Sequence, residues 1–129
     1  MKQIYVTSAV LLRFLLNDDA ALAPHAATAF QKAEQKDCTL WIDPVTIADT
    51  CMSLMEAGFA RKEITSVFTR LLLLDGVICD RETVVLQALD IWARSDDTSF
   101  ADAFALVQSK QSKALFLTEE DLIRVSSII

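Results

Sequence analysis

The spacing of apolar and polar residues along the chain predicts short strands that alternate with helices. Apolar runs typical of strands occur at 4–6, 39–42, 77–79 and 114–117, and 126–129 is a candidate edge strand. Between them, apolar residues recur at helical spacing over about 10–16, 24–36, 45–55, 60–74, 81–94 and 99–107, and a last short helix begins at Thr118. This alternation predicts right-handed crossovers and a parallel sheet with helices on both faces. We therefore expect residues 1–129 to form a single α/β domain.

The first strand leads directly into a pair of hydroxyl residues, Thr7 and Ser8, and then into an apolar helix. A continuous apolar strand is typical of a parallel sheet in which both faces are buried, and we expect this strand to be the central one. Ligands of such sheets bind outside the carboxyl ends of the strands. The sequence therefore predicts that Thr7, Ser8 and Ala9 lie at the floor of any site.

Composition and charge restrict the function classes. The chain is 53% hydrophobic and 23% charged, as expected for a globular protein. Its formal net charge of −6 argues against sequence-independent coating of nucleic acid but leaves room for an acidic metal pocket. Cys38, Cys51 and Cys79 form no CxxC pair, which favours reduced, partly buried thiols. No apolar run reaches the roughly 18–20 residues of a membrane span, so we expect a cytoplasmic protein without membrane contact.

Several carboxylates stand out because of their neighbours. Asp49 lies inside an apolar helical run, and Asp102 lies between two Phe-Ala pairs. Glu119, Glu120 and Asp121 follow the strand predicted at 114–117. Burying a carboxylate without a partner is costly, so such residues are expected to be paired, to face a cleft or to bind a cation. Oxygen ligands without His or Cys suit Mg²⁺ or Mn²⁺.

A structural explanation of the same carboxylates remains open. Ser99-x-x-Asp102 and Thr118-x-x-Asp121 both match the capping pattern at the start of a helix. Carboxylates in a first helical turn also interact favourably with the helix dipole. On this interpretation the chain is an α/β domain of another kind, and its acidic residues only cap helices.

Four segments, in their order and spacing, resemble the PIN-domain family, in particular the VapC-like toxins of bacterial toxin–antitoxin pairs. The resemblance implies a three-layer α/β/α sandwich with a mostly parallel central sheet. It also implies a Mg²⁺- or Mn²⁺-dependent ribonuclease that cleaves RNA phosphodiesters, forms a homodimer and is blocked by an antitoxin protein. The segments are Val10-Leu11-Leu12-Arg13-Phe14-Leu15-Leu16-Asn17-Asp18-Asp19, Pro44-Val45-Thr46-Ile47-Ala48-Asp49, Phe100-Ala101-Asp102-Ala103 and Leu117-Thr118-Glu119-Glu120-Asp121.

The resemblance also assigns site residues. It places Asp49 where the family usually has Glu, Asp102 at the third acidic position, and Glu119, Glu120 or Asp121 at the fourth. Asp49, Asp102 and Glu120 are then the predicted catalytic residues.

At the first acidic position the chain departs from the family. Thr7 and Ala9 stand where the family has a metal-binding Asp and an Asn. A hydroxyl is a weak, neutral metal ligand, and each 1.36 kcal/mol of lost transition-state stabilisation is a tenfold loss of rate. Two hypotheses therefore follow, a ribonuclease with a weakened or inactive metal site and a catalytically silent module that binds a protein partner or RNA.

The apolar run Leu71–Leu74 covers more than one face of its helix. A one-sided surface helix does not need this pattern, so the run predicts either deep burial or a homodimer contact.

Overall fold

The computed structural model describes residues 1–129 and contains a three-stranded parallel sheet. The strands are β1 (Lys2–Tyr5), β2 (Cys38–Ile42) and β3 (Val77–Cys79), in the order β1-β2-β3. In the register of the sheet, Ile4 lies opposite Leu40, and Leu40 lies opposite Val77. The predicted α/β class and the parallel pairing are therefore confirmed.

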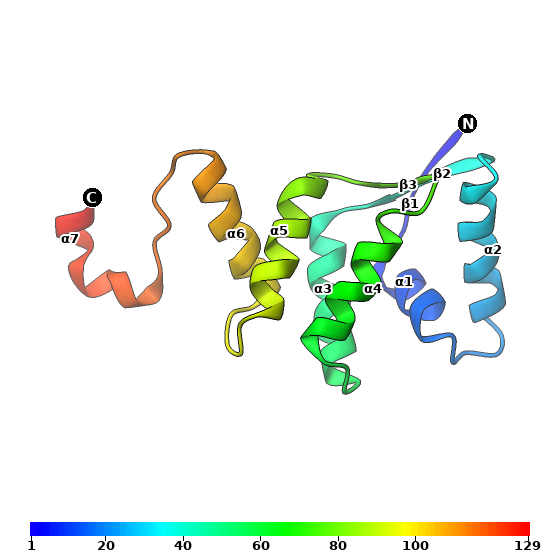
Figure 1. The fold of residues 1–129 in the computed structure, drawn as a ribbon, viewed down its shortest axis with the longest axis horizontal. Helices are drawn as coiled ribbons and strands as arrows, with labels where there is room; N and C mark the ends of the chain where they lie inside the picture. Colours follow the sequence, from blue (N-terminus) through cyan, green and yellow to red (C-terminus); the bar gives the residue numbers. More distant parts are fainter.

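The helices follow the predicted segments closely at the N-terminal side of the chain and depart from them at the C-terminal side. Figure 1 shows them below and beside the sheet, with the C-terminal segment extending away from the rest of the chain. They are α1 (Ser8–Leu16), α2 (Ala23–Glu34), α3 (Pro44–Glu56), α4 (Arg61–Leu71), α5 (Glu82–Ala93), α6 (Phe100–Gln111), the 3₁₀ helix η1 (Glu119–Arg124) and α7 (Val125–Ile128). None of them is long and apolar enough to cross a membrane.

Several helix ends form where the sequence predicts them. Asn17 ends α1 in the left-handed conformation, with φ of 50°. The Asp43 carboxylate caps α3 by accepting a hydrogen bond of 2.8 Å from the Thr46 N–H, with Pro44 as the next residue. Gly58 follows α3 with φ of 98°, a conformation that glycine adopts without a steric penalty.

One hydrophobic core joins the sheet to the helices. Leu40 and Ile42 of the middle strand, Leu11 of α1 and Phe68 of α4 are fully buried in it. The run at the end of α4 is divided between the core and solvent, since Leu71 and Leu72 are buried whereas Leu73 is 73% exposed and Leu74 39% exposed. The core thus accounts for half of this run.

The sequence predicts that the first strand is the central one. In the structure, β1 lies at the edge of the sheet instead. β2 pairs with both neighbours and is almost entirely buried, whereas β1 pairs only with β2 and all four of its residues are exposed. Apolar composition predicts a strand here but does not determine how many neighbours the strand acquires.

The two C-terminal strands were also predicted wrongly. Residues 114–117 belong to no helix or strand, and residues 126–128 of the predicted edge strand lie in helix α7. Strand formation requires a partner, and Figure 1 shows that α6 and the following segment lead the chain away from the sheet.

A candidate carboxylate site

A cavity of about 430 Å³ between α6 and the segment that follows it is lined by four carboxylates. Asp97 comes from the loop before α6, Asp102 from its first turn, and Glu119 and Glu120 from the start of η1. Leu106, Phe116 and Leu117 form the apolar part of the wall. The structure therefore brings together Asp102 and two members of the predicted acidic cluster.

Asp102 is available to a ligand even though its helix is capped as the sequence pattern suggests. The Ser99 hydroxyl accepts a hydrogen bond of 3.0 Å from the Asp102 N–H, so Ser99 is the N-cap of α6. The Asp102 carboxylate, in contrast, forms no hydrogen bond or ion pair with another residue, and no reciprocal bond to Ser99 completes a capping box. The helix cap therefore uses the backbone N–H of Asp102, and its carboxylate remains free.

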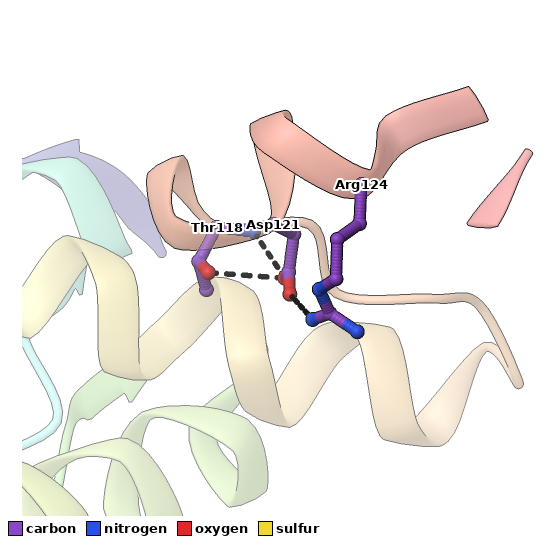
Figure 2. Close-up of polar contacts among 3 residues, drawn as sticks. All are labelled: Thr118, Asp121 and Arg124. Atoms are coloured by element: carbon purple, nitrogen blue, oxygen red, sulfur yellow. Dashed lines mark hydrogen bonds and ion pairs between the residues drawn. The ribbon is translucent and has the colours of Figure 1, made fainter. Parts of the chain in front are cut away.

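Asp121 differs from its two neighbours because its carboxylate is used within η1. Figure 2 shows that it accepts hydrogen bonds from the N–H and the hydroxyl of Thr118, both at 3.0 Å, and one from Arg124 at 2.8 Å. The Thr118 N–H is the main reason that the pKa of Asp121 lies below its usual value of 3.8. Asp121 does not line the cavity, so Glu119 and Glu120 are the better placed members of the cluster.

Asp49 lies outside this cavity, in the middle of α3. It is exposed, and its carboxylate accepts a hydrogen bond from the Ser8 hydroxyl at the start of α1. The argument from the cost of burial therefore does not apply to Asp49, because the apolar neighbours in sequence lie on other faces of the helix.

Thr7 and Ala9 stand where the PIN-domain family has a metal-binding Asp and an Asn. In the structure, neither residue lines the carboxylate-lined cavity. The Thr7 hydroxyl caps α1 by accepting a hydrogen bond of 3.4 Å from the Val10 N–H. Ala9 lines a separate, mostly apolar cavity between α1 and α2, together with Arg13 and His25. The single histidine of the chain is thus separate from the carboxylate-lined cavity.

Two contributions to the site were missed by sequence reasoning. Asp97 lies in a polar loop, where an acidic residue is expected to form turns, and its carboxylate indeed accepts a hydrogen bond of 3.2 Å from the Ser95 hydroxyl. Arg61 holds this loop. Its guanidinium donates to the carbonyl oxygens of Thr98, at 2.6 Å, and Trp92, at 3.1 Å, and lies 5.0 Å from the centre of the Trp92 ring. The sequence around Arg61 does not indicate that its side chain binds the loop before α6.

The side chains that line the cavity are of the type that binds a hard divalent cation, but they are not clustered closely. Carboxylates are the preferred ligands of Mg²⁺ and Mn²⁺. No group of three or more His, Cys, Asp or Glu side chains is close enough together to hold a metal ion. Mg²⁺ is commonly bound through only one or two carboxylates and completes its shell with water, so its binding does not require three clustered carboxylates.

No protein-family model matches the chain, and no curated protein matches it significantly.

Proposed function

We propose that this chain is a PIN-like, VapC-type ribonuclease with an altered metal site, in which Asp102, Glu119 and Glu120 replace a full acidic cluster. The observation that carries the proposal is the cavity between α6 and η1 that these residues and Asp97 line. The parallel β-α order of the first three strands also agrees with a PIN-like scaffold. The proposal includes the finer architecture of that family, a three-layer α/β/α sandwich.

The chain's own residues have simple roles in this proposal. Asp102 and Glu120 would hold Mg²⁺ or Mn²⁺, and Glu119 would accept a proton from water near the phosphate. The cation, when bound, lowers the pKa of a coordinated water and neutralises charge on the phosphodiester. Leu106, Phe116 and Leu117 form the apolar wall of the same cavity. Asp49 keeps its hydrogen bond with Ser8 outside the cavity and takes no part in holding the cation.

The proposal is tested by titrating the protein with Mn²⁺ in a calorimeter and by measuring Mn²⁺-dependent cleavage of a single-stranded RNA. Asp102→Asn and Glu120→Gln keep the shape of each side chain and remove its charge, so each is expected to weaken Mn²⁺ binding and to reduce cleavage at least tenfold. Asp37→Asn is the matched control, because Asp37 is exposed and lies away from the cavity. The absence of binding at millimolar Mn²⁺, together with the absence of cleavage, contradicts the proposal.

A second candidate is a catalytically silent PIN-like module that binds RNA or a protein partner. It is favoured by Thr7, whose hydroxyl caps α1, and by Asp49, whose carboxylate is already bonded to Ser8. The two candidates are separated by the double variant Thr7→Asp, Ala9→Asn. If the parent protein binds RNA without cleaving it and the double variant cleaves, the silent module is correct. Cleavage by the parent that is lost in Asp102→Asn supports the ribonuclease.

Partners follow from the same proposal. We propose RNA as the substrate, an antitoxin protein as the inhibitor, and a homodimer as the working form, with the exposed Leu73 and Leu74 as one candidate contact. The reading frame next to this one, if it encodes a small DNA-binding protein, provides the antitoxin to be tested by co-expression and co-purification.

A further inference from the structure

The outer edge of β1 is unprotected. β1 pairs only with β2, so the backbone N–H and C=O groups on its other side have no strand to pair with. Edge strands of this kind are usually protected by proline, a bulge or a covering segment. Lys2–Tyr5 contains no proline, and its four residues are exposed, including Ile4 at 38% and Tyr5 at 66%.

The segment Ala114–Leu117 also has backbone groups without hydrogen-bond partners. It is apolar and belongs to no helix or strand, with Leu115 76% exposed and Leu117 44% exposed. The N–H groups of Leu115, Phe116 and Leu117 donate to no acceptor in the chain. An apolar segment outside any helix, with free backbone N–H groups, is suited to strand addition at a sheet edge.

The two elements do not meet within one chain. The buried side chains of Phe100, Ala103 and Val107 hold α6 against the core, and α6 packs mainly on α5. Figure 1 shows that the segment after α6 continues away from the sheet, so that α7 and β1 lie in separate parts of the chain. The segment therefore reaches a β1 edge most directly on a second copy.

Charge selects the direction of pairing. Lys110 and Lys113 precede the segment and Glu119 and Glu120 follow it, whereas β1 begins with the N-terminal amine and Lys2 and ends near Asp43 and Asp49. An antiparallel arrangement places acidic residues beside the amine and Lys2, and lysines beside Asp43 and Asp49. A parallel arrangement places like charges together, which is unfavourable.

We propose that Ala114–Leu117 of one copy adds antiparallel to the outer edge of β1 of a second copy, and that two such contacts close a symmetric dimer. In this register Lys2 lies opposite Leu117, and Ile4 lies opposite Leu115. Leu115 and Leu117 then extend the face of the sheet that contains Ile4 and the fully buried Leu40. Phe116 and Leu117 also line the carboxylate-lined cavity, but the contact does not require that cavity to be catalytic.

The first test measures mass by multi-angle light scattering at micromolar protein. The intact chain is expected to be a dimer, and the double variant Leu115→Pro, Phe116→Pro a monomer with an unchanged helical circular dichroism spectrum. Two consecutive prolines are needed because alternate N–H groups of a strand face the partner. Ile123→Asp is the control, because Ile123 is 92% exposed and lies outside the segment. A monomeric intact chain, or a dimer that survives the prolines, overturns the proposal.

The second test determines which residues meet. An equimolar mixture of Lys2→Cys and Leu117→Cys chains is oxidised, with the intact chain, whose three cysteines are buried, as the control. A disulfide-linked dimer is expected only in the mixture. The absence of that product, or a bridge formed within single chains that carry both changes, overturns the proposal.

Discussion

The Ser8 hydroxyl donates a hydrogen bond of 2.5 Å to the Asp49 carboxylate, which joins the start of α1 to the middle of α3 although the residues are 41 positions apart. Ser8 follows β1 and α3 follows β2, so this bond connects two neighbouring crossovers at the carboxyl ends of their strands. It also occupies the carboxylate of Asp49, a predicted site residue that, like Asp121, lies outside the acidic cavity.

The first prediction concerns this bond. Ser8→Ala is expected to lower the free energy of unfolding by about 1 kcal/mol, the usual contribution of one hydrogen bond. A double-mutant cycle with Asp49→Ala is expected to give a coupling energy of similar size, measured by urea denaturation. A cycle that pairs Asp49→Ala with Ser66→Ala, an exposed serine of α4, serves as the control and should give no coupling. Equal values in the two cycles would show that Ser8 and Asp49 do not interact.

The two glycines provide a matched pair for the second prediction. Both have positive φ, 98° at Gly58 and 80° at Gly76. A Cβ at Gly58 meets nothing, whereas a Cβ at Gly76 would overlap the backbone carbonyl of Ala33 at the end of α2. Gly58→Ala should therefore cost about 1 kcal/mol from backbone strain alone, and Gly76→Ala clearly more. Urea denaturation of both variants checks this order, and an equal loss of stability would contradict it.

The sequence was a sufficient guide to these local features. Asp43-Pro44, Asn17 and Gly58 mark helix ends through chemistry that acts within a few residues, and all three lie where the sequence predicted. The position of β1 and the state of 114–117 could not be obtained in the same way. Both depend on which strands become neighbours, and local composition does not encode this.

In the candidate site, too, the residues marked by their sequence neighbours were predictable, and those placed by tertiary contacts were not. Asp102 was identifiable because it lies between apolar residues in the sequence, although its side chain is exposed, and the acidic cluster because it follows the apolar run at 114–117. Asp97 was not identifiable, since its place at the cavity depends on how Arg61 of α4 holds the loop before α6. The separation of Asp49 from the cavity likewise follows from tertiary packing.

The third prediction concerns Arg61, whose guanidinium binds three carbonyl oxygens, those of Trp92, Asp96 and Thr98. Arg61→Lys should lose about 2 kcal/mol of unfolding free energy, because an ammonium group cannot reproduce the planar set of donors. Lys62→Ala, at the exposed neighbouring residue, should change stability little. Full stability of Arg61→Lys in urea denaturation would show that the guanidinium geometry is unimportant.

The fourth prediction concerns pH. Burial raises the pKa of the Cys51 thiol to about 12, and burial, with help from nearby carboxylates, raises that of Cys79 to about 12, from a usual value of 9.0. Between pH 9 and 12 the unfolded thiols lose protons while the folded ones keep them, so the folded state loses stability as pH rises through this window.

Urea denaturation at several pH values above 8 measures the effect. The Cys51→Ala, Cys79→Ala variant should show a smaller decline than the intact chain over the same pH range. In the folded chain both thiols should also react slowly with a thiol reagent at pH 8 and become reactive on unfolding. Rapid reaction of both thiols in the folded protein would refute their burial.

The central claim is that the cavity lined by Asp97, Asp102, Glu119 and Glu120 binds a divalent cation. The most direct measurement is a titration with Mn²⁺, followed by the paramagnetic broadening of backbone amide signals in NMR spectra. The account predicts that substoichiometric Mn²⁺ broadens the amides of 97–102 and 117–121 first, that Asp102→Asn weakens this broadening, and that Asp37→Asn leaves it unchanged. Broadening spread evenly over all exposed carboxylates, or none at millimolar Mn²⁺, would contradict the account.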